Sequence, residues 1–113
     1  MLLEAKKHLE DIRLAAASTL DFTRGKNYDD YCASAMLRSA VERQFQIMGE
    51  ALNRLLRTDP VVAESIEHCE RIIAFRNILV HGYDVINDRV VWDVVRKDQP
   101  ELHARVVALL GQG

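Results

Sequence analysis

The chain has 113 residues, of which 49% are hydrophobic and 28% are charged, and its formal net charge is -2. This length predicts a single domain, 1–113, that buries about two thirds of the surface exposed by the unfolded chain. The small negative charge argues against a protein that holds nucleic acid by bulk electrostatics, although it does not exclude a local basic cleft.

The cysteines and histidines indicate whether disulfides or metal sites are to be expected. Cys32 and Cys69 are too few for a disulfide framework and form no CxxC pair, which predicts a reduced, cytoplasmic protein. Charged residues follow directly after the three apolar residues at the start of the sequence, so we expect no signal sequence. No apolar run approaches the ~20 residues that are needed to cross a bilayer. The histidines have no companion ligands at zinc-site spacing, and we predict no metal site and no cofactor.

The first half of the chain predicts two helices. Apolar residues recur at steps of three and four over 2–20, the pattern of an amphipathic helix. The composition of 23–27 predicts a turn, after which Asp29 or Asp30 is expected to cap a second helix. The apolar stripe of this helix continues to Leu55, so it is expected to be the longest of the chain, at about 28 residues.

Pro60 disfavours a helical residue before it and suits the first turn of a new helix, so the long helix is expected to end there. The segment 61–68 is interpreted as a short helix or an irregular connector. From Cys69 the apolar pattern returns and continues through Val80, and Gly82 is expected to end this third helix in a left-handed turn.

The last part of the chain predicts one more main helix after a short one. Asn87 or Asp88 is expected to cap a valine-rich helix over 90–95, because a strand there would have no partner strand. Asp98 and Pro100 repeat the pattern of a polar cap and an early proline, which predicts a break before the final helix. The fold class is therefore an all-α bundle of four main helices.

The stretch 76–83 brings together four polar side chains of different chemical types. It contains a permanently charged guanidinium (Arg76), an amide (Asn77), an imidazole that titrates near neutrality (His81) and a phenol (Tyr83). An arginine and a histidine together suit phosphate chemistry, since one grips phosphate oxygens and the other accepts a proton from a hydroxyl. RNA carries its own nucleophile, the 2′-hydroxyl, so its cleavage requires no metal ion.

The helix that carries this stretch is apolar on two faces. One face is expected to fill the core of the bundle and contains Ile72, Phe75, Ile78 and Leu79. The other face contains Ile73 and Val80, flanked by Arg76, Asn77 and His81, and needs a second surface to bury against. A symmetric homodimer satisfies this need, and would bring two copies of Arg76 and His81 to one cleft.

A purely structural interpretation of the same residues stays open. Arg76 could pair with Glu50 on the long helix, and His81 could stabilise the carboxyl end of its own helix. Glu50 and Arg54 are also spaced for an ion pair along that helix, and a Glu50 that faces Arg76 could orient the guanidinium. Further arginines could rim an RNA path, although each alone is more often a surface charge: Arg54, Arg57, Arg71 and Arg89.

The pattern Arg76-x4-His81-x-Tyr83, with Asn77 after the arginine, matches the R-x4-6-H motif of HEPN domains. The strings RNILVHGYDVIND, VERQFQIMGEALNRL and VVWDVVRKDQPEL occur in the expected order over most of the chain. The chain therefore resembles the HepT family of toxins, whose members are encoded beside a minimal nucleotidyltransferase antitoxin, MntA.

This resemblance implies a HEPN-type four-helix up-and-down bundle with short extra helices, which forms a homodimer and acts as a metal-independent RNA endonuclease. Arg76 and His81 would be the catalytic pair, supported by Asn77 and Glu50, and cleavage would leave a cyclic phosphate and a 5′-hydroxyl. Tyr83 would accept AMP groups from the antitoxin, which would place negative charge where an RNA phosphate must bind. A tyrosine ring that simply packs over the helix end is the alternative.

Two other functions compete with a toxin ribonuclease. The chain could be a non-catalytic helical subunit that presents a nucleotide or substrate to a nucleotidyltransferase, with Arg76 and His81 bound to phosphate. It could also be a dimerisation domain without a substrate. The intact pair of arginine and histidine favours catalysis over both.

Overall fold

The computed structural model describes residues 1–82, 84 and 86–111, and these residues form helices and no strand. The elements are α1 (Leu3–Thr23), α2 (Tyr28–Ala33), α3 (Ala35–Thr58), α4 (Pro60–Glu64), α5 (Cys69–His81), α6 (Asp88–Asp93), the π-helical segment η2 (Val94–Asp98) and α7 (Gln99–Gly111). The predicted all-α class is confirmed. Within the described ranges, no helix has both the length and the apolar character needed to cross a membrane.

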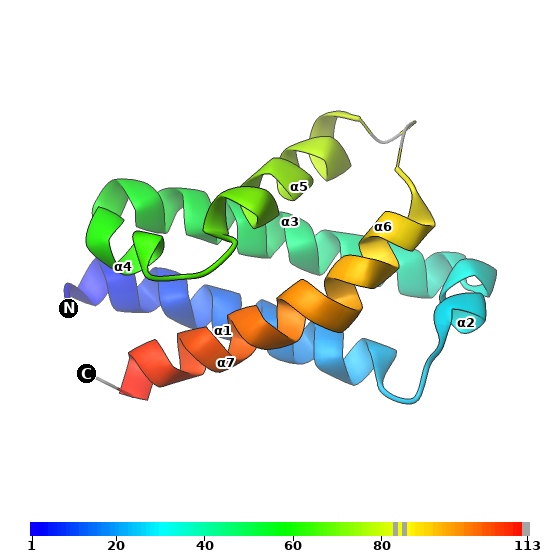
Figure 1. Ribbon diagram of the computed structural model, residues 1–113, viewed down its shortest axis with the longest axis horizontal. Coiled ribbons are helices and arrows are strands. Elements are labelled where there is room, and N and C mark those ends of the chain that lie inside the picture. The colour runs from blue at the N-terminus through cyan, green and yellow to red at the C-terminus, as the bar shows by residue number, and fades with distance from the viewer. Residues whose placement is uncertain (83, 85, 112–113) are drawn as a thin grey trace.

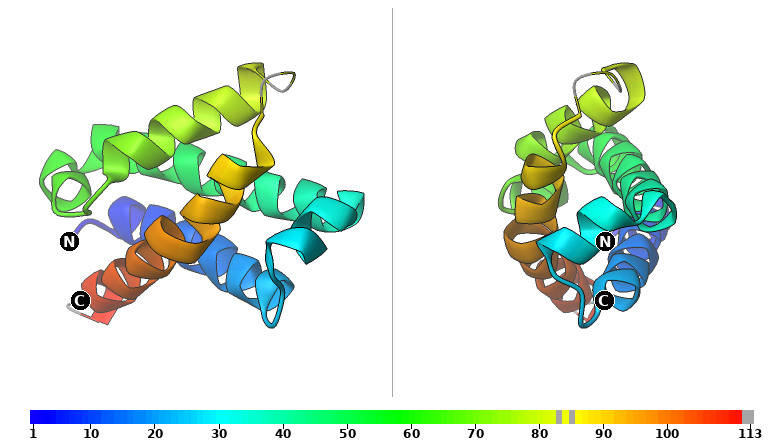
Figure 2. Two further views of the ribbon diagram at one scale, coloured as in Figure 1. Left: turned by 45° about the vertical axis from the view of Figure 1, so that its right-hand side comes forward. Right: turned by 90° about the vertical axis from the view of Figure 1, so that its right-hand side faces the viewer.

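The long helices alternate in direction along the chain (Figure 1). α1 and α3 pack against each other, α5 packs on α3, and α7 packs on α1. The helices therefore surround a common centre when the molecule is viewed along its long axis, and α2 lies across one end (Figure 2, right). This is the up-and-down organisation expected from the sequence, with α2, α4 and α6 as the short extra helices.

Aromatic pairs join helices that are distant in sequence. Phe45 of α3 contacts Phe75 of α5 edge to face, with 5.3 Å between ring centroids. Tyr31 of α2 packs on Trp92 of α6 at the same distance, and both rings are buried. Because Phe75 directly precedes Arg76, the first pair holds the part of α5 that carries Arg76 against the long helix.

The start of the long helix differs from expectation. Asn27, and not Asp29 or Asp30, caps α2. Its side chain accepts a hydrogen bond from the N–H of Asp30, and the carboxylate of Asp30 accepts one from the N–H of Asn27. α2 then stops at Ala33, because Ser34 is extended (φ -117°, ψ 105°) and caps a new helix, α3. The expected single helix is thus two, and α3 has 24 residues.

The expected break at Asp98 and Pro100 is wrong. The chain stays helical from α6 through η2 into α7. Proline has no N–H and its ring crowds the carbonyl four residues earlier, so the wider π turn just before Pro100 accommodates it without ending the helix. Asp98 is buried and pairs with Arg71 at 3.2 Å, and Gln99 donates a hydrogen bond to the Ala16 carbonyl of α1 at 2.7 Å.

The backbone conformations of the residues that flank α5 were not predicted correctly. Gly82 has φ -122° and ψ 38°, so the predicted left-handed turn after α5 is wrong. Its N–H still bonds to the Ile78 carbonyl at 2.8 Å, which continues the helical pattern for one more residue. Of the residues that flank α5, it is His68, directly before the helix, that has a left-handed backbone (φ 66°).

Candidate active site between α3 and α5

The two helices that form the candidate site approach each other closely at Gly49. A Cβ atom added to Gly49 would overlap with the Arg76 side chain, at 2.6 Å from its Cγ. Any larger residue would therefore push α5 away from α3. Sequence reasoning did not single out Gly49, and the signal that could have found it is a glycine in the middle of a long amphipathic helix.

Arg76 is held by two neighbours. One guanidinium nitrogen lies 3.0 Å from Glu50 Oε2, and another donates a hydrogen bond to Asn77 Oδ1, also at 3.0 Å. The Arg76 side chain is only 24% exposed, and that of Glu50 is 33% exposed. The predicted pairing of Arg76 with Glu50 is confirmed as a contact, and the same carboxylate also accepts a hydrogen bond from Arg54 at 3.1 Å.

A hollow of about 420 Å³ opens beside this ion pair. Its lining includes the guanidinium groups of Arg43, Arg54 and Arg76 and the carboxylates of Glu50 and Asp11. The Nε–H of Arg76 is buried and has no hydrogen-bond partner among the described residues. The hollow thus has an excess of positive charge, which suits an anionic ligand such as a phosphate.

His81 is not brought to Arg76 within one chain. It is the last residue of α5 and is exposed. Five residues separate it from Arg76, which corresponds to about 140° around the helix and about 7.5 Å along it. His81 is not among the residues that line the hollow.

Exposed apolar side chains surround the end of α5. Ile78 is 48% exposed and Val80 is 37% exposed. The prediction that Ile78 fills the core is wrong, because its side chain borders a small surface hollow between α5 and α6 together with Val90. Ile73 is partly buried and packs against the core. Tyr83 lies outside the described residues.

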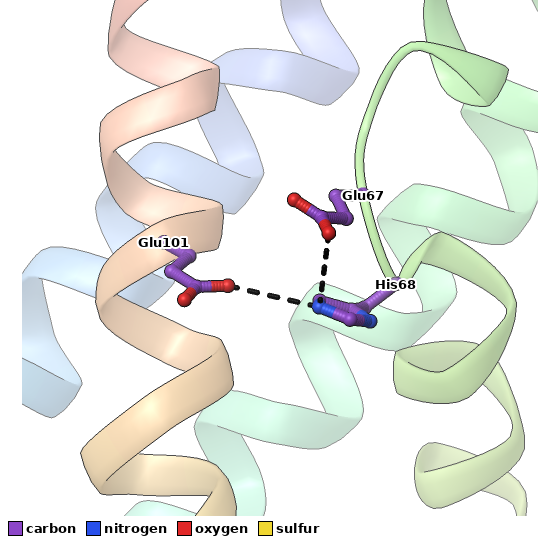
Figure 3. A group of neighbouring side chains, drawn as sticks. All are labelled: Glu67, His68 and Glu101. Carbon is purple, nitrogen blue, oxygen red and sulfur yellow. Dashed lines mark ion pairs between the residues drawn. The ribbon is translucent and has the colours of Figure 1, made fainter.

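Three potential metal ligands meet at the opposite end of α5 (Figure 3). His68 Nε2 lies 3.6 Å from a carboxylate oxygen of Glu67 and 3.7 Å from one of Glu101. All three residues are exposed, and ion pairs between histidine and carboxylates account for the arrangement. Glu101 is 33 residues from His68, so ligand spacing could not reveal the group. We assign no metal site to it.

An alternating bundle of four main helices, with an arginine and a histidine five residues apart on the third, defines the HEPN class of helical protein. Residues 12–109 match the family model described as ribonuclease HepT-like, and the chain belongs to this family. Family membership assigns it to the HEPN-type ribonucleases.

Several curated proteins are similar to this chain over most of its length. "Putative RNase MJ1380" of Methanocaldococcus jannaschii is 30% identical over 91% of this chain and 94% of its own. "Probable ribonuclease HepT" of Thermococcus cleftensis is 30% identical over 88% of this chain and 90% of its own. "Putative RNase TTE0752" of Caldanaerobacter subterraneus is 27% identical over 93% of each chain. No solved structure matches the chain.

Proposed function

We propose that this chain is the toxin of a HepT/MntA toxin–antitoxin system and cleaves RNA internally without a metal ion. The observation that carries the proposal is the placement of Arg76, which lies at a hollow with excess positive charge. A guanidinium in this position can bind two phosphate oxygens while it remains tied to Glu50.

In the proposed reaction the 2′-hydroxyl of RNA attacks the adjacent phosphorus atom. A base removes the hydroxyl proton, Arg76 stabilises the charge on the five-coordinate phosphate, and an acid protonates the departing 5′-oxygen. The bond between phosphorus and the 5′-oxygen breaks, so the products end in a 2′,3′-cyclic phosphate and a 5′-hydroxyl. His81 is the residue proposed for proton transfer, because its side chain is exposed at the end of α5 and imidazole is the commonest general acid and base in enzymes.

A homodimer is part of the proposal. Within one chain His81 lies outside the hollow beside Arg76, so a complete site requires a second copy of the helix end. The exposed side chains of Ile78 and Val80 offer an apolar surface for such a contact. Under two-fold symmetry the same surface would serve both chains and bring two Arg76 and two His81 residues to one cleft.

The antitoxin is proposed to act on Tyr83. Gly82 follows the last residue of α5, so Tyr83 comes two residues after His81 in sequence. AMP transferred to its hydroxyl by an MntA-type nucleotidyltransferase would add phosphate charge near the position of the RNA phosphate and so oppose binding. Tyr83→Phe should leave the ribonuclease active but insensitive to the antitoxin and ATP. Continued inhibition of Tyr83→Phe would reject this role.

One observation favours the second candidate, a nucleotide-binding subunit of a nucleotidyltransferase. In the single chain Glu50 offsets the charge of Arg76, and no hydrogen bond joins Arg76 to His81 within the described residues. A site of this kind can bind phosphate without catalysing proton transfer. Nucleotide binding without RNA turnover would therefore select this candidate.

The decisive experiment incubates the purified chain with end-labelled RNA in EDTA, beside Arg76→Ala and His81→Ala, and analyses the product ends. Cleavage by the unaltered chain alone, with cyclic phosphate ends, supports the proposal. Equal cleavage by all three proteins indicates a contaminant, and no cleavage by unmodified protein rejects it. Mixing the two variants then tests the dimer, because a site made from Arg76 of one chain and His81 of the other would regain activity.

A further inference from the structure

A second hollow, of about 590 Å³, lies where the start of α1 meets the end of α3. It is lined by Leu2, Glu4, His8, Arg54, Arg57 and Thr58. Arg54 also lines the hollow beside Arg76, so a single side chain borders both hollows. The two hollows are therefore neighbours along α3.

The charges around this second hollow favour an anion. Arg57 has no carboxylate within ion-pair distance in the part of the chain that the structure describes, and Arg54 contacts only one acid, Glu50. Glu4 opposes an anion, but its side chain is 70% exposed and can turn towards solvent. The arginines are one helical turn apart on α3, about 4.5 Å along the axis, so both can reach one phosphate group or two successive ones.

Two further polar features lie at the same place, His8 and the amino end of α1. His8 is only 7% exposed, and its Nδ1 has no hydrogen-bond partner among the described residues. Its Nε2 is 3.9 Å from Glu4, a long contact that a ligand could replace. α1 begins here with no side-chain cap, which leaves N–H groups of its first turn and the positive end of its dipole available.

We propose that this hollow is a phosphate subsite for RNA. The strand would run from the hollow beside Arg76 past Arg54 to Arg57 and His8, so that cleavage occurs at one end of the track and the flanking backbone is held at the other. The subsite rests on the proposed function for its ligand, since RNA is the anion that such a nuclease must hold along several phosphates. Contacts of this kind bind without regard to base identity.

The test measures binding of a 2′-O-methyl RNA of about 20 nucleotides, which cannot be cleaved, by fluorescence anisotropy over a series of salt concentrations. Arg57→Gln should weaken binding and reduce the slope of log K against log salt by about 0.7, the value for one lost phosphate contact to a single strand. Arg24→Gln is the matched control, because Arg24 lies at the other end of α1 and pairs with Asp21. It should leave the slope unchanged.

A second variant is expected to change RNA affinity in the opposite direction. Glu4→Gln removes the one carboxylate that lines the hollow and should tighten RNA binding. Equal slopes for Arg57→Gln and Arg24→Gln, or no effect of Glu4→Gln, would overturn the subsite. Cleavage of ordinary RNA by the unaltered chain is scored separately. If the chain cleaves but the slopes are equal, only the subsite fails; if the slope changes without any cleavage, the nuclease fails and the subsite stands.

Discussion

The two ends of α5 both gather charged side chains, but they do so in different ways. Near the carboxyl end, Arg76 is largely buried against Glu50 at the point where Gly49 lets α5 touch α3. At the amino end, His68 meets two carboxylates on an exposed surface. The first group is positioned by helix packing, whereas the second is free to rearrange.

This difference separates a candidate active site from a surface ion-pair cluster. A catalytic group must be held within a fraction of an ångström, and only packed neighbours can do that. The amino-terminal group also has the residue types of a familiar metal-ligand set, a histidine with two carboxylates. Exposure argues against it, and the predictions below test the comparison.

The largest effect is expected from the residues at the carboxyl end. Arg76→Ala or His81→Ala should lower the rate of RNA cleavage by about 100-fold or more, because each removes either charge stabilisation or proton transfer from the transition state. His68→Ala is the matched control, since it removes an imidazole from the other end of α5. Gel analysis of product formation measures all three, and a similar loss for His68→Ala would undo the comparison.

Gly49→Ala should lower both stability and activity. The added Cβ overlaps with Arg76, which costs about 1–3 kcal/mol by overpacking. Better helix propensity offsets about 1 kcal/mol of this cost. Gly111→Ala is the control, because a Cβ there meets no atom within 4 Å. Denaturant melts should show a lower midpoint for Gly49→Ala alone. An unchanged midpoint would mean that the close approach does not hold α5 in place.

Glu50→Gln should separate binding from catalysis. Removal of the carboxylate strengthens the local positive charge, so RNA is expected to bind more tightly and KM to fall. The ion pair that orients Arg76 is lost at the same time, and kcat should fall by about tenfold. Glu64→Gln removes the same charge from an exposed position on α4 and serves as control. Steady-state kinetics would contradict this role for Glu50 if kcat stayed constant.

The smallest effect concerns metal ions. If the cluster of Glu67, His68 and Glu101 consists of surface ion pairs, then Zn²⁺ or Mn²⁺ should not raise the melting temperature, and EDTA should not alter cleavage. Thermal melts with each metal chloride, against MgCl₂ at equal ionic strength, check this expectation. A melting temperature that rises with Zn²⁺ concentration and stays constant in His68→Ala would instead establish a metal site there.

The sequence predicted the helices well where their signals are local. Apolar residues at steps of three and four, together with Pro60, placed α1, α5 and the end of α3 to within a few residues, because periodicity and capping depend on near neighbours. The break at Ser34 and the continuous helix through Pro100 were not predicted. Each depends on a choice between similar local patterns, which burial of residues such as Tyr31 and Gln99 decides.

The features of the candidate site also divide into those that the sequence predicts and those that depend on packing. The sequence by itself determined which groups are available, since Arg76, Asn77 and His81 lie on one helix and Glu50 could be named as a partner. Only the tertiary structure decided that Gly49 brings the two helices into contact, that Ile78 faces outward and that His8 joins Arg57 at a second hollow. Such contacts join residues tens of positions apart, so they depend on how helices cross and pack rather than on the spacing within any one of them.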